Sequence, residues 1–76
     1  MVGRIGGNMS IRDLMDQFEI QGAYHIKSWT DAYEDYFTLA KGTDFECDRN
    51  KIKSKYLNAE ITYMYAIDGV LNIEVK

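Results

Sequence analysis

Residues 59–76 read Ala-Glu-Ile-Thr-Tyr-Met-Tyr-Ala-Ile-Asp-Gly-Val-Leu-Asn-Ile-Glu-Val-Lys, and two alternating segments flank the pair Asp68-Gly69. An Asp-Gly pair between alternating segments is typical of a two-residue β-hairpin turn, because both turn positions require positive φ. The sequence therefore predicts strands over residues 59–67 and 70–76 that are joined by this turn.

A two-residue turn also determines which residues lie opposite each other, and the expected pairs are Ile67 with Val70, Tyr65 with Asn72 and Tyr63 with Glu74. One face of this hairpin is apolar apart from a threonine and is expected to pack on the core; it carries Thr62, Met64, Ala66, Leu71, Ile73 and Val75. The opposite face is unusually apolar for a solvent-facing side, and it carries Ile61, Tyr63, Tyr65 and Ile67.

A short helix is predicted to begin after Ser10. The Ser10 hydroxyl and the Asp13 carboxylate are spaced for a reciprocal capping box, and Met9 and Leu14 occupy the positions of a hydrophobic staple. The apolar residues that follow have helical spacing and end at Phe18.

Two further strands are expected over residues 23–29 and 36–41, where apolar residues alternate, and the acidic segment 30–35 joins them as a hairpin loop. The segment from Thr43 to Asn58 allows two interpretations. Either Asp48 caps about one turn of helix that carries Ile52 and Tyr56, or the segment is an ordered loop.

These elements together predict an α+β fold, in which the N-terminal helix packs on a four-stranded antiparallel sheet. Residues 1–8 are expected to form a flexible leader, and residues 9–76 a single domain. The expected core consists of Ile11, Leu14, Met15, Phe18, Ile26, Phe37, Leu39, Met64, Leu71, Ile73 and Val75.

Composition limits the class of protein. The chain has 76 residues, of which 46% are hydrophobic and 28% charged, with a net charge of −3, so it is globular and too weakly charged to identify a nucleic-acid binder. It contains no apolar run long enough to span a membrane and no apolar segment of a secretory signal. Its single cysteine fits a reducing compartment, so a cytoplasmic location is expected.

The residues needed for catalysis are mostly missing, so we expect no enzyme. The chain has one histidine, His25, and one cysteine, Cys47. Cys47 lies between Glu46 and Asp48, and neighbouring carboxylates raise the pKa of a thiol, which opposes its use as a nucleophile.

No metal or cofactor is expected either. The acidic spacing of residues 44–50 resembles the opening of a calcium loop, but Arg49 and Lys55 occupy the positions that require glycine and glutamate. One cysteine and one histidine are too few ligands for zinc. The glycine-rich residues 3–7 lack the Gly-Lys-Ser/Thr of a phosphate-binding loop.

The first candidate site is a protein-binding surface made of the tyrosine face and the acidic loop, and its residues are Ile61, Tyr63, Tyr65, Ile67, Asp31, Tyr33, Glu34 and Asp35. Tyrosine is enriched at interfaces, so this face is a candidate contact with a protein partner of unknown identity or with a second copy in a homodimer. A second interpretation stays open, in which Tyr56 or the segment 43–58 folds over the tyrosine face.

The alternative candidate site is a nucleic-acid-binding segment that consists of Arg49, Lys51, Lys53, Lys55 and Tyr56. In an extended chain the four cations would share one face and could follow a phosphate backbone, whereas in a helix they would scatter around the axis.

The stretches 9–15, 20–22, 61–65 and 68–75 together resemble short uncharacterised proteins from mobile elements and prophages of Firmicutes. This resemblance implies a mobile-element context, in which small acidic proteins include inhibitors of host defence nucleases such as anti-CRISPR proteins. The expected function is therefore a small non-enzymatic binding protein that inhibits a host nucleic-acid-binding effector.

The substitution Gly69→Val tests the predicted turn. Valine is strained at positive φ, so the free energy of unfolding, measured by urea denaturation, is expected to fall by more than about 1 kcal/mol. A variant with wild-type stability would show that the two-residue turn and its register are wrong.

Overall fold

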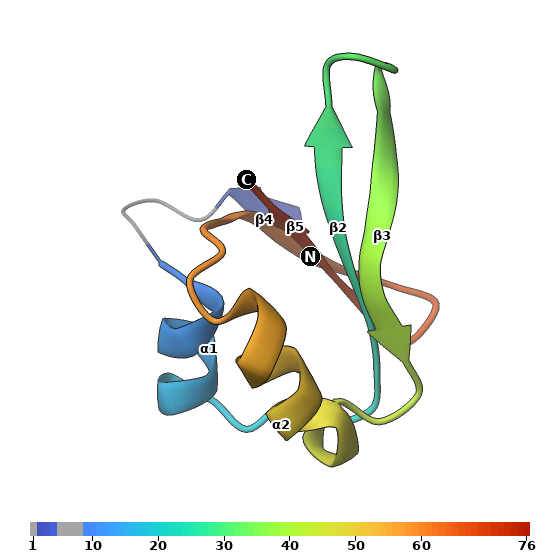
Figure 1. Ribbon diagram of the computed structural model, residues 1–76. Coiled ribbons are helices and arrows are strands. Elements are labelled where there is room, and N and C mark those ends of the chain that lie inside the picture. Colours follow the sequence, from blue (N-terminus) through green and yellow to red (C-terminus); the bar gives the residue numbers. More distant parts are fainter. Residues whose placement is uncertain (1, 5–8) are drawn as a thin grey trace.

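The computed structural model describes residues 2–4 and 9–76, and within them the unit α–β–β occurs twice in succession (Figure 1). A short strand precedes the two units. The elements are β1 (Val2–Arg4), α1 (Ile11–Gln17), β2 (Ala23–Thr30), β3 (Asp35–Gly42), α2 (Phe45–Tyr56), β4 (Ile61–Ile67) and β5 (Val70–Val75).

The strands form one sheet in the order β1-β4-β5-β2-β3. The hairpins β2–β3 and β4–β5 are antiparallel as predicted, but β5 pairs with β2 in parallel. The α+β class is confirmed, whereas the prediction of a wholly antiparallel sheet of four strands is wrong. A hairpin turn determines pairing only within its own hairpin, and the two hairpins join through strands that are distant in sequence.

The strand β1 lies in the segment that the sequence analysis assigned to a leader. Its three residues pair antiparallel with β4, and Gly3 lies opposite Met64. Residues 1 and 5–8 lie outside the described part of the chain, and for them the flexible leader stays a prediction.

The predicted capping box of α1 is present. The Asp13 amide donates to the Ser10 hydroxyl oxygen at 3.2 Å, and the Ser10 amide donates to Asp13 Oδ2 at 3.0 Å. The helix ends at Gln17, and Phe18 is already extended and 53% exposed. Phe18 was expected in the core, and this was wrong because the helix stops one residue before it.

The segment 43–58 forms the twelve-residue helix α2, which is longer than either sequence interpretation. Its N-cap is Asp44, which accepts from the Cys47 amide at 3.2 Å. Asp48, the expected cap, instead accepts a hydrogen bond from the Tyr24 hydroxyl at 2.7 Å. The helix packs against the sheet through the buried side chains of Phe45 and Ile52.

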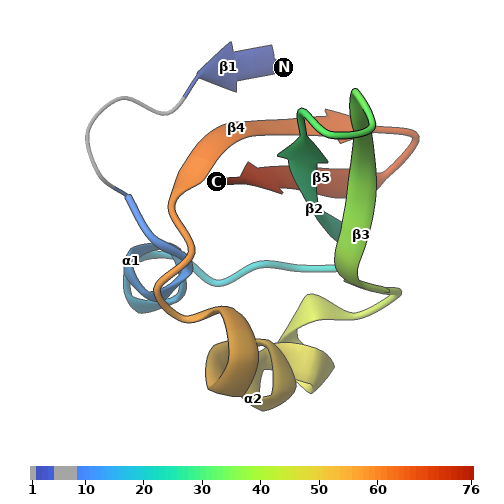
Figure 2. The same cartoon turned by 45° about the horizontal axis from the view of Figure 1, so that its top comes forward.

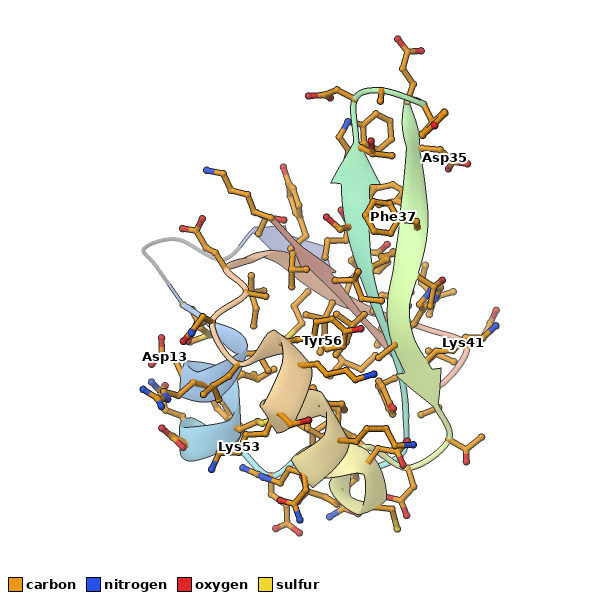
Figure 3. The ribbon with its side chains drawn as sticks, in the orientation of Figure 1. Asp13, Asp35, Phe37, Lys41, Lys53 and Tyr56 are labelled. Atoms are coloured by element: carbon orange, nitrogen blue, oxygen red, sulfur yellow. The ribbon has the colours of Figure 1, made fainter. Side chains whose placement is uncertain are left out.

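The core lies between the two helices and one face of the sheet. Its buried residues are Ile11, Leu14, Met15, Ile20, Tyr24, Ile26, Phe45, Ile52, Ile61, Ile73 and Val75. Leu39, Met64 and Leu71, which were expected in the core, are partly buried at its margin. Phe37 was also expected there but is 50% exposed, because the β2–β3 hairpin projects beyond the helices (Figures 1 and 3).

The turn Asp68-Gly69 has positive φ at both residues, +52° and +76°, as a type I′ turn requires. All three predicted pairs are present in the register of β4 and β5. Near the start of β4 the register shifts, and Ile61 lies opposite Val75. This β-bulge moves Ile61 from the expected tyrosine face to the core, where it is 1% exposed.

The substitution Gly42→Ala tests the contact between β3 and α2. A Cβ on Gly42 would lie 2.6 Å from Asp48 Oδ2 and 2.9 Å from Tyr24 Cε1, so the buried Tyr24 ring or the helix must shift. We expect the free energy of unfolding in urea to fall by about 1–3 kcal/mol.

Thr43→Ala is the matched control for Gly42→Ala, because Thr43 is the exposed neighbour of Gly42. Its free energy of unfolding should stay within about 0.5 kcal/mol of the wild type. Equal stability of the two variants would contradict the close approach of Tyr24 and Asp48 to Gly42.

Candidate functional site

The helices α1 and α2 lie on the same side of the sheet (Figure 2). The opposite side carries no helix within the described residues, and we call it the helix-free face. By strand register and alternation, this face presents His25, Lys27 and Trp29 from β2, Tyr36, Thr38 and Lys41 from β3, Tyr63, Tyr65 and Ile67 from β4, and Asn72 and Glu74 from β5.

Lys27 lies at the centre of the helix-free face. Its ammonium nitrogen is 5.2 Å from the centroid of the Tyr36 ring and 5.3 Å from that of Tyr65, so a cation–π contact forms with a ring on each side. It also donates to Asn72 Oδ1 at 3.4 Å. These contacts hold the two tyrosines of β3 and β4 in one surface, although β2 and β5 separate them.

Glu74 is a buried carboxylate next to this lysine, and it lies opposite Lys27 in the parallel pairing of β2 and β5. The Tyr36 hydroxyl donates to Glu74 Oε1 at 2.8 Å. This hydrogen bond raises the pKa of Tyr36 above 10.0, and partial burial and the negative charge of Glu74 add to the shift. Tyr36 is therefore neutral and fixed in orientation at neutral pH.

Trp29 connects the helix-free face to the loop between β2 and β3. Its ring packs edge-to-face on Tyr36, with 5.0 Å between the ring centroids and 71° between the planes. Its indole N–H donates to Asp31 Oδ1 at 2.7 Å. The aromatic surface is thus continuous with the acidic loop.

That loop forms the end of the projecting hairpin, and Figure 3 shows Asp35 there, far from both helices. Tyr33 is 84% exposed and Glu34 has a positive φ of 51°. We call Asp31, Tyr33, Glu34 and Asp35 the acidic tip. All four residues are exposed, so their three carboxylates and one phenol are accessible to another molecule, although Asp31 and Asp35 each accept one hydrogen bond within the chain.

The structure brings together most residues of the first candidate site. Tyr63 is 41% exposed, Ile67 is exposed and Tyr65 is half-buried against Lys27, whereas Ile61 belongs to the core. Tyr56 does not cover the tyrosines, because α2 lies on the other side of the sheet and the Tyr56 hydroxyl donates to the Leu39 carbonyl at 2.8 Å. The interpretation in which residues 43–58 fold over the tyrosine face is therefore wrong.

Sequence reasoning missed the contribution of Trp29, Tyr36 and Lys27 to this surface; it placed Glu74 opposite Tyr63 but did not find its bond to Tyr36. The alternation of residues 23–29 places Lys27 and Trp29 on one face of their strand. Only the parallel pairing of β2 with β5 brings that face next to the tyrosines of β4.

The basic segment is helical, so its cations do not share one face. Arg49 donates to both oxygens of Glu46, at 3.0 and 3.1 Å, and to the carbonyl of Met15, which ties α2 to α1. Lys51 and Lys55 line a groove beside β3, and Lys53 is outside that groove.

His25 and Cys47 belong to different parts of the molecule and form no dyad. His25 hydrogen-bonds Thr38 Oγ1 at 2.7 Å on the helix-free face, and burial, followed by Lys27 and Lys41, lowers its pKa below 6.5. Cys47 is on α2, where its thiol donates to Asp44 Oδ2 at 3.2 Å. This hydrogen bond raises the pKa of Cys47, so the direction expected from the sequence is confirmed, although Asp44 is its main cause.

The acidic residues that resemble a calcium loop lie along α2 and its N-cap, where residues two apart point in different directions. Within residues 2–4 and 9–76, no group of three or more histidine, cysteine, aspartate or glutamate side chains is placed to hold a metal ion. In the same part of the chain, no helix has the length and apolar character needed to cross a membrane.

Comparison with known proteins adds no relative: no family model matches this sequence, and no curated protein or solved structure matches it.

The substitution Glu74→Gln tests the hydrogen bond that fixes Tyr36. Glutamine can accept a hydrogen bond but carries no negative charge, so the charge-assisted bond and the Coulombic effect that raise the Tyr36 pKa both weaken, and this pKa is expected to fall part of the way toward 10.0. The measurement is a pH titration of the tyrosine ring carbons by NMR, with Glu60→Gln as a control that leaves Tyr36 unchanged.

The raised pKa of Tyr36 also predicts how the free energy of unfolding depends on pH. The folded-state pKa of Tyr36 is raised, so its contribution to stability is fully present below pH 10.0 and is lost as pH rises through the folded-state value. Glu74→Gln should therefore lose less stability in that alkaline range than the wild type. An unchanged Tyr36 pKa in this variant would contradict a charge-assisted bond to the Glu74 carboxylate.

Proposed function

We propose that this protein is a small non-enzymatic protein-binding module that holds its partner against the helix-free face and the acidic tip. The observation that supports this most strongly is the continuity of the two surfaces. Trp29, Tyr36 and Tyr63 are each more than 40% exposed on one sheet face, and the bond from Trp29 to Asp31 joins that face to the tip.

The composition of the helix-free face suits a contact surface. Tyrosine and tryptophan are enriched among the residues that dominate binding energy, since they offer a large contact area at low entropic cost. Lys27 and Glu74, the charged groups at its centre, already have partners in Asn72 and Tyr36. A partner would therefore not have to leave an unpaired charge buried at the centre of the interface.

The acidic tip indicates the chemistry of the partner. Its carboxylates adjoin the aromatic surface, so the complementary surface is basic next to an apolar patch. Opposite fields of this kind speed the encounter of two proteins and select against acidic surfaces.

The most concrete form of this proposal is an inhibitor, encoded by a mobile element, of a host nucleic-acid-binding defence effector, similar to an anti-CRISPR protein. Such effectors hold nucleic acid in a positively charged channel, which an acidic and aromatic surface could occlude. The support for this form is the resemblance to mobile-element proteins together with the charge and aromatic character of the surface.

The second proposal, nucleic-acid binding through the segment from Arg49 to Tyr56, has weaker support. Lys51, Lys53 and Lys55 are exposed on α2, but Arg49 is engaged by Glu46 and Tyr56 by Leu39. Binding to DNA at low salt that weakens steeply as salt rises would favour this proposal.

The double substitution Tyr63→Ser/Tyr65→Ser tests the proposed surface. The variant should remain folded but capture its partner about tenfold or more less strongly, because tyrosine anchors typically contribute about 2 kcal/mol or more to binding. The measurement is affinity capture from a host that expresses nucleic-acid-binding defence effectors, followed by mass spectrometry and titration of the captured effector.

Phe18→Ser is the matched control, because Phe18 is an exposed aromatic residue outside the helix-free face. It should capture the effector as the wild type does. A double variant that folds and captures normally would remove the helix-free face from the proposal, and a double variant that unfolds would show that the tyrosines are structural.

A further inference from the structure

A second surface lies between β3 and α2 and meets the helix-free face at the edge of the sheet, at Lys41, which lies opposite His25. It is a groove of about 190 Å³, and Figure 3 shows Tyr56 between the helix and the strand there, with Lys41 on the strand. We call it the lysine groove, and the residues used below are Lys41, Lys51, Lys55, Leu39, Ile52 and Asp48.

The lysine groove combines cationic groups with an apolar floor. Its three lysines are exposed and come from two elements, and within residues 2–4 and 9–76 none of the three forms an ion pair. Its one carboxylate, Asp48, already accepts the Tyr24 hydroxyl at 2.7 Å. The partly buried Leu39 supplies the apolar surface of this floor, and Ile52 lies beneath it in the core. Such a groove suits an acidic segment that also carries a large apolar or aromatic side chain.

This chain itself presents such a segment, the acidic tip. The tip has three carboxylates against the three lysines, and between them Tyr33 has the highest exposure of the large hydrophobic residues described, at 84%. The tip also stands clear of the body of the molecule on a projecting hairpin (Figure 1). It can therefore enter a groove on another molecule without a clash between the two bodies.

The tip cannot reach the groove of its own chain. Asp35 begins β3 and Lys41 is close to its end, so about 20 Å of extended strand separates them. We propose that the lysine groove binds the acidic tip of a second copy of this chain. Because tip and groove are different surfaces at opposite ends of one strand, two copies can pair reciprocally, each tip in the other's groove, or copies can add head to tail.

The contact depends on exposed charges, and this determines how it responds to salt. At about 0.1 M salt, charges interact over about 10 Å, whereas at about 1 M the range falls to about 3 Å. Self-association is therefore strongest at low salt and weakens as salt rises.

The first experiment measures mass by sedimentation from about 10 μM to about 1 mM protein, the range expected for a small interface. The wild type should form a dimer or a larger assembly at low salt. A groove variant, Lys41→Gln/Lys51→Gln/Lys55→Gln, and a tip variant, Asp31→Asn/Glu34→Gln/Asp35→Asn, should each associate about tenfold or more weakly, because three ion pairs are lost. The amides of the tip variant keep the oxygen that Trp29 and the Tyr36 amide use.

Each variant has a control with the same change in charge. Arg12→Gln/Lys53→Gln/Lys76→Gln removes three exposed cations outside the groove, and Asp16→Asn/Glu19→Gln/Asp68→Asn removes three exposed carboxylates outside the tip. Both controls should assemble as the wild type does.

The second experiment mixes the two variants. The groove variant keeps a working tip and the tip variant keeps a working groove, so the mixture should form a complex of one copy of each and nothing larger. A wild type that stays monomeric at low salt would overturn the proposal. So would a dimer that both variants still form, or a mixture in which no complex appears.

These results are separable from the proposed function, because Lys51 and Lys55 lie on α2, on the other side of the sheet from the helix-free face. The double variant Lys51→Gln/Lys55→Gln, which keeps Lys41, should lose self-association and still capture the effector. Loss of effector capture without any change in self-association would instead remove the groove proposal and place the groove in the partner-binding surface.

Discussion

The parallel pairing of β2 with β5 is the contact on which the rest of the molecule depends. It joins the two α–β–β units, and at its centre Ile26 lies opposite Ile73, both fully buried. Each hairpin alone would have one apolar face without a sheet to extend it, and an isolated hairpin is at most marginally stable in water. Pairing the two hairpins creates a face wide enough for both helices to cover.

The same pairing creates the helix-free face. It places Lys27 of the first unit beside Glu74 and Asn72 of the second, and it brings Tyr36 and Tyr65 within reach of one ammonium group. A surface that is aromatic, partly exposed and internally paired in charge thus arises from residues of both halves. Neither half contains it alone, so the integrity of the surface is linked to the integrity of the fold.

Local features of this fold were predictable from the sequence, and long-range ones were not. The capping box at Ser10 and the turn at Asp68-Gly69 each depend on neighbouring residues, and both are present. The helix α2 was underestimated because its two buried residues, Phe45 and Ile52, are seven positions apart among charged ones. The tyrosines of the site were found from alternation, but their neighbours Trp29 and Tyr36 were not.

The positions of Ile61 and Leu39 also differ from strict alternation, and in both strands the physical cause is a β-bulge. The extra residue near the start of β4 reverses the side on which Ile61 lies, and a similar register shift opposite Ile26 and Lys27 makes Leu39 the extra residue of β3. A strict period of two has no means to signal such an insertion, because alternation on each side of it looks regular.

The position of β5 in the sheet also determines when the fold can form during synthesis. Of the described strands, β5 is the last to be made, yet it lies between β4 and β2 at the middle of the sheet. Until residues 70–75 have left the ribosome, the edge of β2 that pairs with β5 has no neighbouring strand. During the same time, no strand connects β4 to β2 and β3. Successive domains commonly fold from the N-terminal end as a chain emerges. This chain therefore cannot complete its sheet in that order. The nascent chain therefore exposes the apolar faces of both units until residues 70–75 have emerged, and only then can β5 join the two units.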